Sequence, residues 1–166
     1  MTSENWINKL NLTPHPEGGY FKEIYRSAEF IKADGLPSRY NSDRTFGTSI
    51  YFLLEGNQFS TFHKLKSDET WHFYDGCAIT IYLINSDGRL STVTLGKSLD
   101  ASTVLQFTIP QNTWFAAKPN INNSFSLVGC SVYPGFDFED FEIGKQSELI
   151  RLFPQHETLI KQFTKG

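Results

Sequence analysis

The chain is poor in cysteine, in positive charge and in long apolar runs, and each absence excludes a class of protein. Its two cysteines, Cys77 and Cys130, lie in separate apolar stretches, which excludes a disulfide scaffold and predicts buried thiols. No apolar run approaches the roughly 18 residues of a membrane span, and the first residues lack the apolar core of a signal peptide. We therefore expect a soluble, cytoplasmic protein with no membrane partner.

Basic residues are too few and too scattered for a nucleic-acid protein. Lys and Arg total 15 against 18 Asp and Glu, which gives a formal net charge of −3. Because binding to a phosphate backbone depends on a basic surface, nucleic acid is not an expected partner. The common catalytic signatures are also missing, including a phosphate-binding glycine loop, Gly-x-Ser-x-Gly, Cys-x-x-Cys and His-Glu-x-x-His.

Aromatic residues, by contrast, are abundant. They make up 15% of the 166 residues, while 20% are charged, and this composition excludes a disordered chain and a coiled coil. A chain of this length buries about two-thirds of its unfolded surface, so its core needs neither a metal nor a disulfide. We expect a single domain over residues 1–166.

Short stretches of alternating apolar and polar residues run through most of the chain. They predict strands over 20–26, 47–54, 59–65, 69–74, 77–84, 89–95, 103–109, 113–118 and 125–132. Helical spacing predicts a short helix over 3–10 and two short helices near the end, broken at Pro154. The stretch 27–44 predicts a long mobile loop. Many short strands without intervening helices indicate an all-β sandwich or barrel.

The segment from His63 to Gly76 is the densest in groups that can do chemistry. It holds His63, Glu69 and His72 on what the pattern predicts to be two strands of one hairpin. An even-numbered turn would place His63 on the face of His72, and an odd-numbered turn on the face of Glu69 and Trp71. Either pair is suited to proton transfer or to contributing two metal ligands, and ordinary barrel residues are the structural alternative.

The spacing His63-x5-Glu69-x6-Gly76 resembles the first motif of the cupin superfamily. Residues 15–21 (HPEGGYF), 68–73 (DETWHF) and 133–141 (YPGFDFEDF) are together similar to a branch of small single-domain cupins with no assigned reaction. The resemblance implies an all-β cupin jelly-roll β-barrel, or double-stranded β-helix, with short N- and C-terminal helices. It also implies a homodimer and a pocket open at one end of the barrel.

The same resemblance implies metal-ligand positions at His63 and Glu69, but two further ligand positions depart from the cupin pattern. The second histidine of the His-x-His pair falls on Leu65, and the histidine of the second motif falls on Phe115. His63, Glu69 and His72 would be the ligands of any metal. Since fewer than three protein ligands rarely hold a metal tightly, we expect no firmly bound cofactor.

A metal-free pocket resembles that of sugar-nucleotide epimerases such as dTDP-4-dehydrorhamnose 3,5-epimerase. By this analogy His63 is the base, Glu69 its carboxylate partner, and Tyr51, Tyr82 or Tyr133 the acid. His72 joins the catalytic candidates if it shares the face of His63. The remaining candidates for ligand contact are Glu17, Tyr20, Arg44, Trp71, Trp114 and Phe115, with Arg44 as an anion-holding cation.

We therefore expect a protein that binds a small polar ligand, sugar- or nucleotide-like, in its barrel. The favoured activity is that of an isomerase or epimerase acting through a histidine–carboxylate couple. The alternatives are a non-catalytic binding protein that uses the same pocket, and a metal-dependent oxygenase or lyase.

Overall fold

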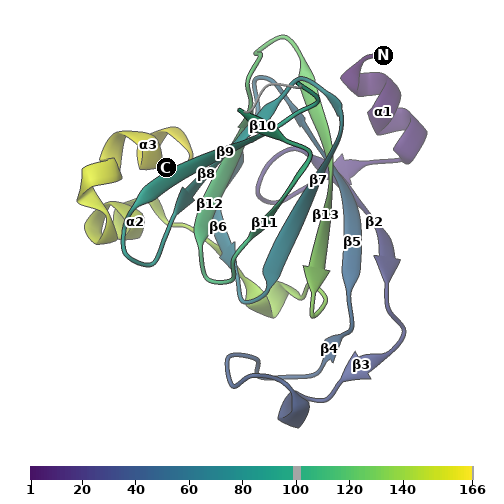
Figure 1. The fold of residues 1–166 in the computed structure, drawn as a ribbon, viewed down its shortest axis with the longest axis vertical. Helices are drawn as coiled ribbons and strands as arrows, with labels where there is room; N and C mark the ends of the chain where they lie inside the picture. The colour runs from purple at the N-terminus through teal and green to yellow at the C-terminus, as the bar shows by residue number, and fades with distance from the viewer. Residues whose placement is uncertain (99–101, 166) are drawn as a thin grey trace.

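Two six-stranded sheets face each other and form a jelly-roll sandwich (Figure 1). The computed structural model describes residues 1–98 and 102–165. The first sheet has the order β1-β2-β5-β13-β7-β11 and the second β10-β9-β8-β12-β6-β14. The strand pairings are antiparallel except for β9 and β10, which run parallel. This architecture confirms the expected all-β jelly roll with short helices at its ends.

The first sheet consists of β1 (Thr13–Pro14), β2 (Tyr20–Arg26), β5 (Thr48–Glu55), β13 (Phe125–Tyr133), β7 (Asp68–Gly76) and β11 (Gln106–Ile109). The second consists of β10 (Thr103–Val104), β9 (Leu90–Leu95), β8 (Ile79–Ile84), β12 (Trp114–Pro119), β6 (Ser60–Leu65) and β14 (Phe141–Ile143). The α-helices are α1 (Ser3–Leu10), α2 (Gln146–Leu152) and α3 (Glu157–Gln162). None of the helices among the described residues is long and apolar enough to cross a membrane.

The strands form where side chains alternate between the core and solvent. Along β7, Glu69, Trp71 and Phe73 are buried, and the residues between them are more exposed. A strand turns successive side chains to opposite faces, so this alternation fixes which face of β7 meets the second sheet. At the chain start, a capping box between Thr2 and Asn5 begins α1.

In two segments the structure differs from the prediction made from the sequence. The expected mobile loop over 27–44 instead contains β3 (Phe30–Ile31), the 3-10 helix Ala33–Gly35 and, at its end, β4 (Arg44–Thr45). β3 and β4 pair into an arm that projects from the sandwich (Figure 1). The expected strand 103–109 is divided, because the chain passes at the exposed Leu105 from β10 in the second sheet to β11 in the first.

The core has separate apolar clusters. The largest lies between the two sheets and contains Phe52, Trp71 and Phe115. A second fills the space between the second sheet and the C-terminal helices, with Trp114 buried and Tyr82 partly buried. A third packs α1 against the first sheet, with Tyr20 and Tyr51 at its edge. Much of the aromatic content therefore stabilises the fold by burial.

Candidate functional site

A cavity opens between the sheets at one end of the sandwich. It holds about 640 Å³ of space free of protein atoms, part of it open to solvent. Its walls are mainly apolar, its inner end is formed by titratable groups, and its mouth carries charged and aromatic side chains. The titratable groups of the inner end are His15, Glu17, His63, Glu69 and Cys130.

Glu17 is carried into the cavity by a tight hairpin loop. β1 and β2 pair on either side of residues 15–19, where Gly18 and Gly19 have φ values of +118° and +73°. These left-handed conformations favour glycine. The loop is tied to β6 because Ser60 Oγ donates to Glu17 Oε1 at 2.8 Å and the Thr61 N–H donates to the Glu17 carbonyl at 3.0 Å. These two hydrogen bonds hold Glu17 in a buried position, in which it is only 6% exposed.

His63 and Glu17 form a close acid–base pair in the cavity. His63 Nδ1 lies 2.7 Å from the Thr61 carbonyl, which can only accept, so Nδ1 carries a proton. His63 Nε2 lies 3.2 Å from Glu17 Oε2. A proton between these atoms belongs either to an imidazolium facing a carboxylate or to a neutral acid facing an imidazole. Burial lowers the pKa of His63, against the raising effects of the Glu69 charge and the Thr61 carbonyl. Burial likewise raises the pKa of Glu17, and the net shifts favour the neutral form of both groups.

Glu69 projects from the opposite sheet and is the second buried carboxyl of the cavity. It is 7% exposed, and burial raises its pKa to about 7, with the charge of Glu17 acting in the same direction and that of His63 opposing. The side chains of Trp71 and Cys130 lie beside the Glu69 carboxyl and act to lower its pKa, but among the described residues neither Glu69 Oε2 nor the buried Trp71 Nε1 has a partner in good hydrogen-bond geometry. A buried polar atom without a partner is costly, and such atoms mark places where a ligand or water binds.

His15 completes the inner end beside Glu17. Its Nδ1 accepts the Glu17 N–H at 3.3 Å and lies 3.7 Å from Glu17 Oε2. The ring meets Phe21 edge to face, with centroids 4.6 Å apart. Burial lowers the pKa of His15, against the raising effect of Glu17. His15 therefore supports the position of Glu17 as a neutral imidazole in a largely apolar corner.

The mouth of the cavity combines a charged pair with aromatic rings. Arg26 donates to both carboxylate oxygens of Glu23, at 3.0 and 2.7 Å, and its Nη1 donates to the Phe136 carbonyl at 3.1 Å. Phe136 and Phe138 meet edge to face with centroids 5.0 Å apart, and Phe138 is largely exposed. A ligand entering the cavity passes these groups before it reaches His63.

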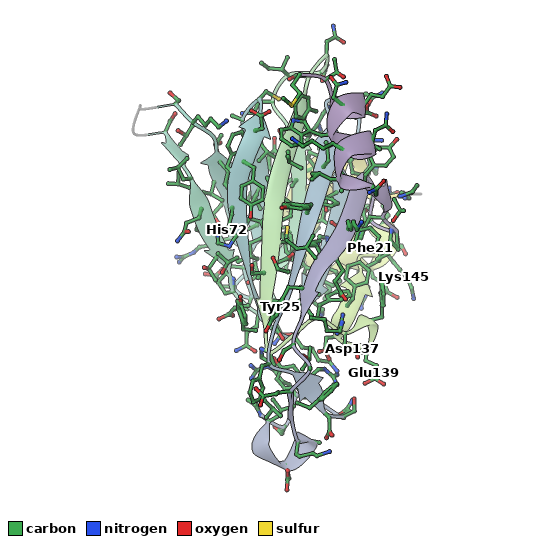
Figure 2. The ribbon with its side chains drawn as sticks, turned by 90° about the vertical axis from the view of Figure 1, so that its right-hand side faces the viewer. Phe21, Tyr25, His72, Asp137, Glu139 and Lys145 are labelled. Atoms are coloured by element: carbon green, nitrogen blue, oxygen red, sulfur yellow. The ribbon has the colours of Figure 1, made fainter. Side chains whose placement is uncertain are left out.

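The structure brings Glu17, His63 and Glu69 together but leaves His72 outside the cavity. The predicted hairpin is wrong, because β6 belongs to the second sheet and β7 to the first. His63 and Glu69 therefore line the same cavity from opposite sheets, whereas His72 alternates with the buried Trp71 and Phe73 and faces away. Figure 2 shows His72 on β7, separated from Phe21 on β2 by the intervening strands.

Tyr133 also lies outside the cavity lining. Tyr133 is the last residue of β13 and is 59% exposed. Its ring packs against Gly47, where a side chain would collide with it. The candidate acids Tyr51 and Tyr82 are likewise absent from the lining, because each packs into an apolar cluster on the far face of its sheet.

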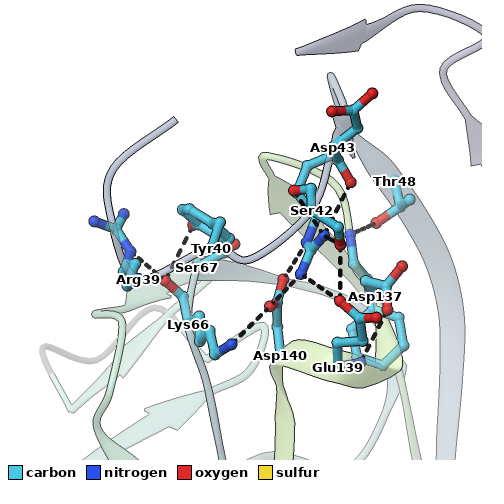
Figure 3. A network of polar contacts seen from close by, with 12 residues as sticks. Arg39, Tyr40, Ser42, Asp43, Thr48, Lys66, Ser67, Asp137, Glu139 and Asp140 are labelled. Carbon is cyan, nitrogen blue, oxygen red and sulfur yellow. Dashed lines mark hydrogen bonds and ion pairs between the residues drawn. The ribbon is translucent and has the colours of Figure 1, made fainter. Parts of the chain in front are cut away.

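Arg44 does not face the cavity as an anion-binding cation. It is 1% exposed and forms a two-pronged ion pair with Asp140, with both N–O distances 2.7 Å. Figure 3 shows Asp140 in the polar network that also contains Ser42 and Glu139. Its remaining N–H groups donate to Ser42, to the Asp43 carbonyl and to Glu139. Since its donors are already used, Arg44 instead fixes the 3-10 helix Phe138–Asp140 to the start of β4.

The other aromatic candidates are core residues. Tyr20 packs in the cluster under α1, Trp114 packs under the C-terminal helices, and Trp71 lies between the sheets. Phe115 also lies in that central cluster, and its ring centroid is 4.0 Å from that of His63. Phe115 is outside the cavity lining, but it supports the back of the imidazole.

The donor set does not fit the divalent metal that a cupin fold implies. His63 Nδ1 is bound to a carbonyl and Nε2 faces Glu17, while Leu65 and Phe115 contribute only apolar groups. Within residues 1–98 and 102–165, no three His, Cys, Asp or Glu side chains are grouped so that they can hold a metal ion.

Several lining residues were missed in the sequence. His15 lies two residues before Glu17 in the HPEGGYF stretch, and the aromatic alternation of Phe136, Phe138 and Phe141 is visible in the last motif. These signals mark the residues but do not place them. Glu23, Arg26 and Cys130 carry no distinguishing local pattern, because only the packing of the sheets brings them to the cavity.

Facing jelly-roll sheets with a histidine and carboxylates in the cavity between them define a cupin. The chain belongs to the Cupin superfamily (DUF985), which it matches over residues 4–144.

Related proteins agree with this membership. The chain is 37% identical to protein SO0799 from Shewanella oneidensis, whose structure superimposes with a TM-score of 0.89 over 99% of this chain and 98% of that one. A hypothetical protein from Leishmania major is 36% identical, with a TM-score of 0.89 over 100% of both chains. The uncharacterized protein YML079W from Saccharomyces cerevisiae is 31% identical over 144 residues, 81% of this chain and 71% of that protein.

Oxalate decarboxylase from Bacillus subtilis shares the fold alone. Its structure at pH 4.6 is 12% identical in sequence, with a TM-score of 0.54 over 91% of this chain and 36% of that one.

Proposed function

We propose that this cupin binds a small polar molecule in its cavity and transfers a proton to or from a carbon beside a carbonyl. The observation that carries the proposal is the contact of 3.2 Å between His63 Nε2 and Glu17 Oε2. Because His63 Nδ1 is already bound to the Thr61 carbonyl, the pair holds its exchangeable proton on the side of Glu17. The activity is of the isomerase or epimerase type.

The geometry supports a histidine–carboxylate couple in which Glu17 is the partner that contacts His63. Ser60 fixes one oxygen of Glu17 and leaves the other facing the imidazole. When the pair has lost its proton it can accept one from a substrate carbon, and when it holds the proton it can return it. Apolar walls that limit water strengthen such electrostatic effects.

Glu69 supplies a second group for the same reaction. Its carboxyl lines the cavity from the opposite sheet, and its pKa of about 7 makes both protonation states available near neutral pH. An epimerase takes a proton from one face of a carbon and returns one to the opposite face of the same carbon, so a site with two exchangeable groups suits this chemistry.

Proton transfer is tested by deuterium exchange. Dihydroxyacetone, D-glyceraldehyde and a 4-keto sugar nucleotide are incubated with the protein in D₂O, and loss of the C–H signals beside the carbonyl is followed by ¹H NMR. We expect exchange above the buffer rate for at least one compound, reduced about 100-fold or more by His63→Gln and by Glu17→Gln. The matched control is His72→Gln, which alters a histidine outside the cavity and leaves exchange unchanged.

The outcomes separate the activities. Exchange that persists in His63→Gln and Glu17→Gln would refute the couple. Binding of a compound without any exchange would refute proton transfer and favour the non-catalytic binding protein. Thermal melting of each variant shows whether a loss of exchange reflects the site or the fold.

A further inference from the structure

The charges around the cavity restrict what its inner end can accept. Glu17 and Glu69 place two carboxyl groups there, and burial lowers the pKa values of His15 and His63, which weakens the positive charge of both rings. A phosphate group in this position would be taken out of water next to acidic groups. Burying an anion without a cation or several donors is strongly unfavourable.

The cation that lines the cavity is also unsuited to hold a phosphate deep inside. Arg26 is the single Lys or Arg among the described lining residues, and it lies at the mouth. Its Nε and Nη2 donate to Glu23, and its Nη1 donates to the Phe136 carbonyl. Arg44, on the neighbouring strand segment, is fully engaged by Asp140 and its other acceptors.

Glu69 provides an independent sign that a ligand oxygen belongs at the inner end. The residue is 7% exposed, and its Oε2 is buried with no partner in good hydrogen-bond geometry among the described residues, although the side chains of Trp71 and Cys130 lie beside the carboxyl. The wall of the same cavity includes the apolar Ile50, Phe52 and Val132, of which Val132 pairs with Glu69 across β13 and β7. A hydroxyl or carbonyl oxygen would satisfy Glu69 Oε2 while the carbon skeleton contacts these walls.

We infer that the cavity selects an uncharged hydroxy-carbonyl compound, with an oxygen at Glu69 Oε2, and discriminates against its phosphorylated or nucleotide-linked forms. The inference rests on the proposed function for the place of the ligand, and it narrows the ligand class. A site for sugar nucleotides must surround a diphosphate with hydrogen-bond donors, and this selectivity for an uncharged ligand distinguishes the present cavity from such a site.

Matched ligand pairs test the selection. Binding of dihydroxyacetone, D-glyceraldehyde and D-fructose is measured by titration calorimetry and saturation-transfer NMR, each beside its own phosphate ester. We expect at least one uncharged compound to bind at least about tenfold more tightly than its phosphate ester, which corresponds to about 1.4 kcal/mol. Equal binding within every pair, tighter binding of the phosphates, or binding of none of these compounds would each overturn the inference.

The role of Glu69 is tested by two substitutions of similar size. Glu69→Leu removes the polar oxygen and is expected to weaken binding of the uncharged compound by about tenfold or more, whereas Glu69→Gln keeps a hydrogen-bonding group and retains part of the affinity. Glu142→Leu, on the exposed face of β14, is the matched control. Unchanged affinity in a folded Glu69→Leu would overturn the assigned contact.

The two proposals fail in different ways. An uncharged compound that binds without C–H exchange refutes proton transfer and leaves the ligand class standing. Exchange that proceeds equally on a compound and its phosphate ester refutes the ligand class and leaves proton transfer standing.

Discussion

Replacing Glu69 by Gln should change how the stability of the protein depends on pH. The buried Glu69 has a pKa of about 7, against 4.5 for the same group in the unfolded chain. Between these pH values the folded protein retains a proton that the unfolded chain has released. Stability due to this group is therefore fully present below pH 4.5 and is lost as pH rises to about 7.

The magnitude follows from the shift. A difference from 4.5 to about 7, at about 1.4 kcal/mol for each pH unit, corresponds to about 3 kcal/mol of unfolding free energy. Glu69→Gln removes this contribution because the amide does not titrate. The unfolding free energy of the natural protein minus that of the variant should thus fall by about 3 kcal/mol between pH 4.5 and pH 8.

The comparison with the variant is needed because other groups act in the opposite direction. The lowered pKa values of His15 and His63 mean that the folded state holds fewer protons on these rings, so their contribution to stability rises with pH. Subtraction of the Glu69→Gln curve removes most of this background. Residual coupling of Glu69 to His63 stays in the difference and is part of what Glu69 contributes.

The assay is urea unfolding followed by tryptophan fluorescence and far-UV circular dichroism at several pH values from 4.5 to 8. Glu142→Gln, in which the replaced carboxylate is exposed on β14, serves as the control for loss of a carboxylate outside the cavity. A difference for Glu69→Gln that stays constant within about 1 kcal/mol would refute the argument that burial holds a proton on Glu69.

Two further predictions concern the elements that hold the cavity together. Asp140→Asn should lower the unfolding free energy by about 3–5 kcal/mol in urea titrations, because it leaves the buried Arg44 charge without its partner. The double change Arg44→Met with Asp140→Leu should recover much of this loss, since it removes both charges. An equal loss of unfolding free energy in the single and the double variant would contradict this account. Gly18→Ala should lower the unfolding free energy by about 1–3 kcal/mol and also slow the C–H deuterium exchange of the substrate. The reason is that the added Cβ meets the Phe59 carbonyl at a φ of +118° and displaces Glu17. A variant with unchanged melting temperature and unchanged substrate exchange would show that the loop tolerates the change.

The local sequence pattern predicted the strands and helices well where their formation depends on residues that are close along the chain. The strands over 20–26 and 79–84 lie within the expected ranges, and the last two helices are separated at Pro154 as expected. Alternation and helical spacing depend on neighbouring residues along the chain, so they are readable without a partner. The paired segment from 27 to 44 was misread because its strands, Phe30–Ile31 and Arg44–Thr45, are each only two residues long, too short to show an alternating pattern.

The candidate site could be predicted from the sequence less completely than the strands and helices. The His63-x5-Glu69 spacing identified two residues that line the cavity, but the contact partner of His63 is Glu17, which is far from it in sequence. Arg44 shows the same limit, because an arginine in a polar loop looks free until the long-range partner Asp140 is seen.

The sequence by itself determined that this chain is an all-β cupin and that His63 and Glu69 are among its chemistry-bearing residues. Only the tertiary structure decided that β6 and β7 belong to opposite sheets, so that His63 faces Glu17 and Glu69 and not His72. Side-chain alternation specifies the two faces of each strand but not the sheet to which the strand belongs. That choice depends on pairing between segments distant in sequence, and the cavity with its buried proton exists only once both sheets are packed.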